Sequence, residues 1–224
     1  TIDAEEMDRF ELYLDLFETL YLSPCLKGWG GLGLVIQAYS KRALHTLLWL
    51  NGLSRENGGQ IKIRLVKGAY WDSEIKHAQQ LGLDDFPVFT RKQATDLNYI
   101  ECARFLIDCN RKEGLLIPQF ATHNANTITR VRHLAQENNF EFHPPPFVKE
   151  IKGKKILILH EPNTIDELIR NDPTIDLVIH GHTHRYVNTI KNGVRVINPG
   201  ESAGILKGKN SVGLLRLKDL SFER

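Results

Sequence analysis

The alternation of strand and helix is clearest in the stretch Ile61-Lys62-Ile63-Arg64-Leu65-Val66-Lys67-Gly68-Ala69-Tyr70-Trp71-Asp72. Its first half alternates apolar and cationic side chains, which predicts a half-buried β-strand over residues 61–66. Polar and aromatic side chains follow at the end of that strand. A helix over residues 74–82 is expected next, with Ser73 as its N-cap.

The same alternation extends outward in both directions from this stretch. We expect strands over residues 34–36 and 115–120, and helices over residues 4–22, 41–53, 91–109 and 124–137. Asp3 and Glu6 are spaced as a capping box for the first helix, and Asn124 is placed to cap the last. Strands separated by helices favour a parallel sheet or barrel, so the fold class predicted here is α/β.

The stretch His143-Pro144-Pro145-Pro146 interrupts this pattern, because three consecutive prolines fit neither a helix interior nor a central strand. Downstream, we expect strands over residues 155–159, 176–179 and 212–217 and a short helix over residues 164–170. Residues 186–190 and 194–197 flank Asn192-Gly193, which predicts a β-hairpin. The chain therefore divides into residues 1–142, a junction over residues 143–146, and residues 147–224.

Composition narrows the classes of function. Hydrophobic residues make up 42% of the 224-residue chain and charged residues 25%, and the formal net charge is +2. These values are typical of a soluble globular protein and give no strong field to attract nucleic acid. Three cysteines without metal-site spacing suggest reduced, packed thiols in the cytoplasm. No apolar run reaches the length of a membrane span. The opening residues include no initiator methionine or signal peptide, so we expect the sequence to begin inside a longer protein.

Polar groups follow three of the predicted strands where each strand ends. In a parallel α/β arrangement such groups share one mouth. The residues are Gln37 after the first strand, Arg64, Lys67, Tyr70 and Trp71 around the second, and Thr122, His123 and Asn124 after the third. Simpler interpretations stay open: Asp3 as a helix cap, Gln37 as a satisfied amide, an Arg64–Asp72 ion pair, and His123 as a loop histidine.

The stretch from Ile63 to Asp72 closely resembles the signature of the proline dehydrogenase domain in bifunctional bacterial proline-utilisation flavoenzymes. The segments Asp3-Ala4-Glu5-Glu6, Val35-Ile36-Gln37-Ala38-Tyr39 and Phe120-Ala121-Thr122-His123-Asn124 resemble the same domain, in the same order. The resemblance runs from Thr1 to about Phe142. It implies a partial (βα)8-barrel and the oxidation of L-proline to pyrroline-5-carboxylate, with hydride passing to FAD.

The resemblance also implies roles for individual residues. The residues that match flavin-contacting positions are Gln37, Arg64, Trp71, His123 and Asn124. Those that match the catalytic and proline-binding shell are Asp3, Arg64, Lys67 and Tyr70. The family also needs a later tyrosine and a pair of arginines, and no segment after Phe142 resembles them. We therefore expect an incomplete barrel whose uncovered sheet edges could pair with another copy.

Three histidines follow the predicted strand that ends at Ile179, in the segment His180-Gly181-His182-Thr183-His184, and His160 ends another strand. Converging imidazoles suit a transition metal, although solvated surface histidines are the alternative. The segments Gly181–His184 and Asn198-Pro199-Gly200-Glu201 resemble the end of calcineurin-like metallophosphoesterases, in their small bacterial and archaeal phosphodiesterase branch. This resemblance covers about Pro145 to Arg224. It implies a partial metallophosphoesterase-type α/β sheet with a C-terminal β-hairpin.

The second resemblance implies that His160, His182 and His184 are metal ligands. For His180 we favour the simpler interpretation of a strand-terminal residue with no role. The implied activity is hydrolysis of a phosphate ester by two divalent transition metals such as Mn, Ni or Zn. The chain contains no Asp-x-His, Gly-Asp or Gly-Asn segment, which the family uses for its remaining ligands. We therefore expect weak metal binding.

Three interpretations of the whole chain follow. It is a flavoenzyme segment that acts on L-proline, a metal-dependent phosphodiesterase, or a non-catalytic fusion of two fragments. Because each site lacks family motifs, we expect either activity to be absent or very weak. No nucleic-acid partner is expected for the first half of the chain, and no integral membrane segment is expected.

Overall fold

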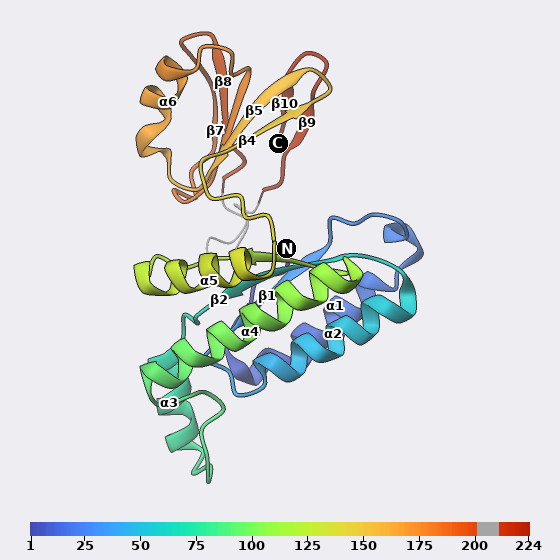
Figure 1. The fold of residues 1–224 in the computed structure, drawn as a ribbon, viewed down its shortest axis with the longest axis vertical. Helices are drawn as coiled ribbons and strands as arrows, with labels where there is room; N and C mark the ends of the chain where they lie inside the picture. The colour runs from blue at the N-terminus through green and yellow to red at the C-terminus, as the bar shows by residue number, and fades with distance from the viewer. Residues whose placement is uncertain (201–210) are drawn as a thin grey trace. The chain divides into compact units, whose positions relative to one another are not determined.

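The computed structural model describes residues 1–200 and 211–224. The chain divides into two compact units, unit 1 (Thr1–Phe142) and unit 2 (His143–Arg224). Both are mixed α/β units (Figure 1). Each hydrophobic cluster of buried residues draws its members from one unit alone.

Unit 1 is built on a parallel three-stranded sheet in the order β1-β2-β3. The strands are β1 (Gly33–Gln37), β2 (Ile61–Val66) and β3 (Leu116–Phe120). The helices are η1 (Met7–Arg9), α1 (Phe10–Tyr21), η2 (Pro24–Leu26), α2 (Ala43–Asn57), α3 (Trp71–Gln80), α4 (Lys92–Glu113) and α5 (Ala125–Glu137).

The period-two alternation of the strands separates the two faces of this sheet. Leu34, Ile63 and Leu116 belong to the core cluster, together with residues of α1, α2, α4 and α5. The alternate residues of β1 and β2 point away from that core and include Val35, Arg64 and Val66. The sheet therefore has one face buried beneath helices and a second face that remains available for a site.

Backbone pairing at the outer edge of β1 explains why the first helix starts later than the sequence predicts. Ile2 lies in an extended segment whose amide donates to Gly33 O at 2.8 Å and whose carbonyl accepts from Val35 N at 3.0 Å. The predicted capping box is wrong, because neither Glu6 nor Arg9, the N-caps of η1 and α1, makes a side-chain cap hydrogen bond. Asp3 instead accepts from its neighbour Ala4 N at 3.0 Å.

Of the other predicted helix starts, one is capped as predicted and two are not. The Asn124 side chain caps α5 by accepting from Thr127 N at 3.0 Å, as predicted. Ser73 is not a cap, because α3 already begins at Trp71. Thr164 stands at the N-cap of α6 (Ile165–Asn171) but makes no side-chain cap hydrogen bond.

Unit 2 contains a five-stranded sheet in the order β4-β5-β6-β8-β7. The strands are β4 (Phe147–Ile151), β5 (Lys154–Leu159), β6 (Leu177–His180), β7 (Val187–Lys191) and β8 (Val194–Asn198). The three central strands are parallel, and β4 and β7 are antiparallel edges. Short η3 (Pro162–Thr164) precedes α6. The Asn192-Gly193 turn joins the antiparallel pair β7 and β8.

The sheet of unit 2 is covered on both faces. One face packs against Ile165 and Ile169 of α6. The other packs against an antiparallel pair formed by β9 (Leu214–Arg216) and β10 (Ser221–Glu223), through residues such as Phe222. Unit 2 therefore has three layers, with α6 and the β9–β10 pair on opposite sides of the sheet (Figure 1).

The cysteines differ in environment. Cys102 and Cys109 are buried on α4, as predicted for packed thiols, but Cys25 in η2 is exposed. No disulfide joins any of them. Within the described ranges, no helix combines the length and apolar character that crossing a membrane requires.

Candidate functional site

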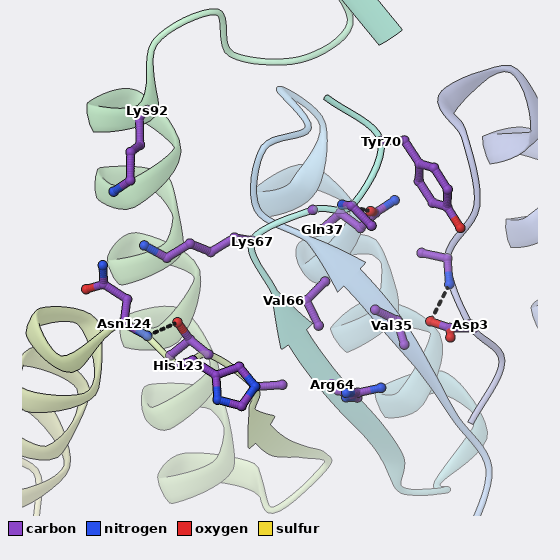
Figure 2. Close-up of a pocket in the computed structure, with 15 residues that line it drawn as sticks. Asp3, Val35, Gln37, Arg64, Val66, Lys67, Tyr70, Lys92, His123 and Asn124 are labelled. Atoms are coloured by element: carbon purple, nitrogen blue, oxygen red, sulfur yellow. Dashed lines mark hydrogen bonds between the residues drawn. The ribbon is translucent and has the colours of Figure 1, made fainter. Parts of the chain in front are cut away.

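An open cleft of about 500 Å³ lies at the carboxyl ends of β1, β2 and β3. Seven of the residues to which the first family resemblance gives a role line it, and Figure 2 shows them around the same space. They are Asp3, Gln37, Arg64, Lys67, Tyr70, His123 and Asn124. Trp71 is the exception among the predicted flavin contacts. It stands at the start of α3, 42% exposed, and its indole donates to Phe89 O at 2.9 Å.

The strands explain why Arg64 reaches the cleft. Arg64 lies on β2, directly between Val35 of β1 and Gln119 of β3, on the face opposite the core. The Arg64–Asp72 ion pair, one of the simpler interpretations left open by the sequence, does not form, and no carboxylate pairs with Arg64 among the described residues. A guanidinium without a carboxylate partner keeps its five donors available for a ligand.

Gln37 holds the loops that frame the cleft. Its amide nitrogen donates to Glu5 O at 2.9 Å, and its amide oxygen accepts from Ala69 N at 3.1 Å. It thereby joins the N-terminal segment to the loop between β2 and α3. The side chain is buried, so the simpler interpretation of a satisfied amide describes its present contacts.

Lys67 and Asp3 lie on opposite sides of the cleft, with Arg64 between them (Figure 2). Lys67, His123 and Asn124 lie on one side in Figure 2, with Asp3 and Tyr70 on the other. The Tyr70 hydroxyl donates to Glu5 Oε2 at 3.5 Å. Burial, with the nearby carboxylates of Glu5, Glu6 and Asp3, raises the pKa of Tyr70, so the phenol stays protonated.

Two groups near this cleft escaped the sequence analysis. Lys92, at the start of α4, lines the cleft. Asp96, one turn further along α4, forms ion pairs with both Lys67 and Lys92. The i,i+4 spacing of Lys92 and Asp96 could have indicated their pairing. Contact between Asp96 and Lys67 depends on the packing of α4 against β2, which local spacing does not reveal.

In unit 2, His160 and His182 come together at the ends of neighbouring parallel strands. His160 follows β5, and His182 lies two residues after β6. His182 Nδ1 lies 3.2 Å from His160 Nε2, and the ring centroids are 5.0 Å apart. Two nitrogens on one tetrahedral Zn²⁺, each at the usual bond length, lie roughly 3.3 Å apart. The pair therefore has the spacing of two ligands to one metal.

The third predicted ligand does not complete a cluster. In the described part of the chain, no three His, Cys, Asp or Glu side chains gather where they could hold a metal ion. His182 and His184 both have left-handed backbone, with φ of 66° and 55°, which is uncommon for residues other than glycine. The set of His160, His182 and His184 stays a prediction.

Asn198, at the end of β8, holds the loop of residues 181–184 through hydrogen bonds. It is 1% exposed, and its amide donates to Gly181 O at 3.0 Å and Thr183 Oγ1 at 3.2 Å. Its side-chain oxygen accepts from Gly200 N at 2.9 Å. The end of β8 therefore supports the loop that carries His182. Glu201, the last residue of the motif over residues 198–201, lies outside the described residues. His180 is buried beside Gly181 O and Asn198.

Comparison with known proteins finds a different family for each of the two parts of the chain. A model of the family "Proline dehydrogenase" matches residues 1–144, and a model of the "Calcineurin-like phosphoesterase superfamily domain" matches residues 120–220. The chain therefore belongs to the proline dehydrogenase family through its N-terminal part and to the calcineurin-like phosphoesterase superfamily through its C-terminal part. The two matches overlap over residues 120–144, which include α5.

Individual relatives follow the same division. Bifunctional protein PutA of Rhizobium meliloti is 52% identical over 162 residues, and that of Salmonella typhimurium is 47% identical over 162 residues. These alignments cover 68% of this chain but only 13% and 12% of those proteins. Phosphodiesterase MJ0936 of Methanocaldococcus jannaschii is 31% identical over 137 residues, covering 55% of this chain and 82% of that protein.

Solved structures resemble the N-terminal part as well. A structure of proline utilization A with proline bound in remote sites has a TM-score of 0.57 and 51% identity, covering 60% of this chain and 14% of that one. Proline utilization A from Bdellovibrio bacteriovorus, inactivated by N-propargylglycine, has a TM-score of 0.59 and 34% identity, covering 62% and 14%. The chain thus corresponds to a small part of these proteins.

Proposed function

We propose that unit 1 is a partial (βα)8-barrel that carries part of an FAD-dependent proline dehydrogenase site. The observation that supports this most directly is the convergence of Arg64, Lys67, Tyr70, His123 and Asn124 at the carboxyl ends of three parallel strands. Ligands and reactive groups collect at this end of parallel α/β sheets. We expect oxidation of L-proline by this chain alone to be absent or very weak.

The cleft residues fit a flavin in part. Arg64 offers a cation without a carboxylate partner, and His123 and Asn124 line the same cleft. Bound FAD would supply the hydride acceptor, and Arg64 near its ring would stabilise negative charge gained there. The Gln37 amide already makes two hydrogen bonds, one through its nitrogen and one through its oxygen. It could therefore donate to FAD only through the second N–H of its amide nitrogen.

The separation of charge suits a zwitterionic amino acid. The Asp3 carboxylate on one wall would attract a substrate ammonium, while Arg64 and Lys67 would attract its carboxylate. The single proton of the Tyr70 hydroxyl is already donated to Glu5. On the same side of the cleft as Asp3, that hydroxyl would therefore accept a hydrogen bond from the substrate ammonium. These groups bind and orient L-proline in the proposal.

Flavin retention tests the proposal directly. We would incubate the purified full chain with FAD, remove free FAD by gel filtration, and record the visible flavin absorption. The expected result is retained flavin in the natural sequence and most of it lost in Arg64→Met. Arg104→Met, at an exposed arginine paired with Glu101 on α4, is the matched control and should retain flavin. A chain that retains no flavin at any FAD concentration overturns the proposal.

Addition of L-proline to the flavin-loaded protein then measures turnover. Bleaching of the flavin band by proline, absent in Asp3→Asn, would support a working site. Retained flavin without bleaching is the result expected of an incomplete site.

A second candidate function is favoured by the contact between His160 and His182. We propose that unit 2 binds one divalent transition metal weakly through these imidazoles, because their nitrogens already have the spacing of shared ligands. The described residues do not fit a two-metal centre, since no third ligand and no bridging carboxylate joins the pair. The proposal for unit 2 is therefore limited to binding of a single metal ion and includes no step of phosphate-ester hydrolysis.

Equilibrium dialysis with Zn²⁺, Ni²⁺ or Mn²⁺ tests the metal proposal. We expect about one weakly bound ion per chain, lost in His182→Ala and retained in His133→Ala, where an exposed histidine in α5 is removed. Equal binding in all three proteins would contradict it. Metal-stimulated hydrolysis of a chromogenic phosphodiester would show a fuller site. If both flavin and metal are absent, the third interpretation, a non-catalytic fusion, remains.

A further inference from the structure

One carboxylate holds two of the cations that line the cleft of unit 1. Asp96 Oδ1 accepts a hydrogen bond from Lys67 Nζ, and Asp96 Oδ2 accepts from Lys92 Nζ at 2.6 Å. Lys67 follows β2, whereas Lys92 and Asp96 lie in the first two turns of α4. Both lysines line the cleft, but Asp96 does not. Asp96 therefore influences the cleft only through Lys67 and Lys92, which do line it.

The exposure of the three groups shows which contact is better shielded from water. The side chains of Lys67 and Asp96 are 23% and 30% exposed, while that of Lys92 is 71% exposed. Ion pairs that are partly shielded are screened less by salt than fully exposed ones. The Lys67–Asp96 pair is thus the one that can fix a side chain, and Lys92 adds a weaker second contact.

The electrostatics of Asp96 agree with this arrangement. Burial opposes ionisation of the Asp96 carboxyl, but hydrogen bonds from Lys67 and Lys92 outweigh it and hold its pKa below the usual value. Asp96 therefore remains charged through the neutral range. Each of its two carboxylate oxygens accepts a hydrogen bond from one ammonium group, Oδ1 from Lys67 and Oδ2 from Lys92.

We propose that Asp96 is a positioning residue that fixes the Lys67 ammonium on the α4 side of the cleft. Asp3 lines the same cleft and is the acidic group that Lys67 could otherwise approach. With Lys67 held by Asp96, the Asp3 carboxylate accepts, among the described residues, only from Ala4 N. Asp96 thereby keeps the Lys67 ammonium away from the Asp3 carboxylate.

This separation matters for ligand binding, and that part of the inference rests on the proposed function of unit 1. A Lys67–Asp3 ion pair across the cleft would neutralise the two groups that are meant to meet a zwitterion. Asp96 prevents that pairing by giving Lys67 a partner on a rigid helix. The role is carried out through Lys67, without contact to substrate or cofactor.

Lysine acylation tests the positioning without any flavin. We would treat the native full chain with a limiting amount of acetic anhydride and quantify acetylation of Lys67, Lys92 and the exposed Lys112 by peptide mass spectrometry. A lysine held in an ion pair reacts slowly, because its nitrogen must lose a proton and leave its partner. We expect Asp96→Asn to raise acetylation of Lys67 several-fold relative to Lys112.

The controls use the same helix. Asp108→Asn removes another α4 carboxylate, paired with Arg111, and should leave Lys67 acetylation unchanged. Asp96→Glu keeps the charge and should restore most of the protection of Lys67. Unchanged Lys67 acetylation in a folded Asp96→Asn protein overturns the proposal.

A second variant covers the case in which Asp96→Asn fails to fold. Lys92→Gln removes the exposed partner of Asp96 and leaves the Lys67 contact, so Lys67 should stay protected. Exposure of Lys67 to acetylation in Lys92→Gln would overturn the proposal, because Asp96 would then not be what protects it.

Flavin titration separates the positioning of Lys67 from the proposed function. If the natural sequence binds FAD, Asp96→Asn should alter the FAD affinity several-fold and Asp96→Glu should restore it, with Asp108→Asn unchanged. If the natural sequence binds no FAD, the proposed function fails, while the acetylation of Lys67 still decides whether Asp96 positions it.

Discussion

The side-chain oxygen of Asn124 is already engaged by the backbone of α5. It accepts from Thr127 N at 3.0 Å, and the Thr127 hydroxyl lies 3.1 Å from the same oxygen. The sequence suggests two roles for Asn124, a helix cap and a flavin contact. In the folded chain only its amide NH₂ remains for a ligand, because the oxygen caps the helix.

We predict that Asn124→Ala lowers the free energy of unfolding of unit 1 by about 1 kcal/mol, the usual cost of losing an N-cap. Asn124→Asp should cost much less, since a carboxylate caps a helix as well and is favoured at a helix N-terminus. Urea unfolding followed by tryptophan fluorescence measures both. Equal losses in the two variants would show that the cap contributes nothing.

Asp172 in unit 2 gives a prediction for pH. Hydrogen bonds from Lys155 and Thr174 lower the pKa of Asp172 to about 2, below its ordinary value of 3.8. Its stabilising contribution is therefore complete above pH 3.8 and is lost as the pH falls through about 2. We expect Asp172→Asn to unfold at lower temperature than the natural sequence at pH 6. The difference should shrink to nothing as the pH approaches 2, as measured by circular dichroism.

At the scale of elements, the pairing of β1 with β2 depends on a residue without a side chain. A Cβ at Gly33 would overlap Lys62 O, a backbone atom that cannot move aside without disturbing the ladder. A Cβ at Gly30, only three residues earlier, would meet Gln60 at an ordinary 3.5 Å.

We predict that Gly33→Ala destabilises unit 1 by about 1–3 kcal/mol, the range typical of overpacked sites. Gly30→Ala should change the stability by less than about 0.5 kcal/mol, as surface substitutions usually do. The midpoints of urea unfolding of the two variants provide the comparison. A Gly33→Ala protein as stable as Gly30→Ala would mean that β1 and β2 can separate at Gly33 without cost.

How well each element could be predicted depends on whether its signal is local. Strand β2 follows from the alternation of Ile61, Ile63 and Leu65, and the structure gives the same bounds. Strand β4 does not follow from the sequence pattern, because it is almost wholly exposed and so lacks an apolar alternation. The Asp3–Glu6 capping box has correct spacing but fails, because Ile2 pairs with β1 and holds the chain extended.

The residues of the candidate site were likewise predictable only where the signal is local in the sequence. Seven residues with roles implied by the family resemblance line one cleft, because residues at the ends of parallel strands must lie near each other. Trp71 carries the right motif, yet its indole is satisfied by Phe89 O outside the cleft. Asp96 has no motif that distinguishes it from other carboxylates of α4. Its partnership with Lys67 exists only through packing between elements distant in sequence.

At the scale of the whole molecule, the two units have separate cores and can be followed separately. All three tryptophans, Trp29, Trp49 and Trp71, lie in unit 1. Tryptophan fluorescence therefore reports the unfolding of unit 1 alone, whereas far-ultraviolet circular dichroism reports both units.

We predict that Leu177→Ala, in the fully buried centre of the unit 2 sheet, destabilises that unit by about 2–5 kcal/mol. The urea midpoint seen by tryptophan fluorescence should not change. Leu65→Ala, an equally buried leucine of unit 1, should lower the fluorescence midpoint instead. A shift of the fluorescence midpoint in Leu177→Ala would show that the units unfold as one cooperative body.

The distribution of the three thiols makes unit 1 a convenient object for chemical labelling. Cys25 is exposed in η2, whereas burial raises the pKa of Cys102 to about 12 and also raises that of Cys109. A maleimide dye added to the native protein should therefore attach at one place. Slower labelling of Cys102 and Cys109, seen as later increases in mass, would report how often α4 leaves the core. The labelling rates of these two buried thiols therefore measure local opening of unit 1.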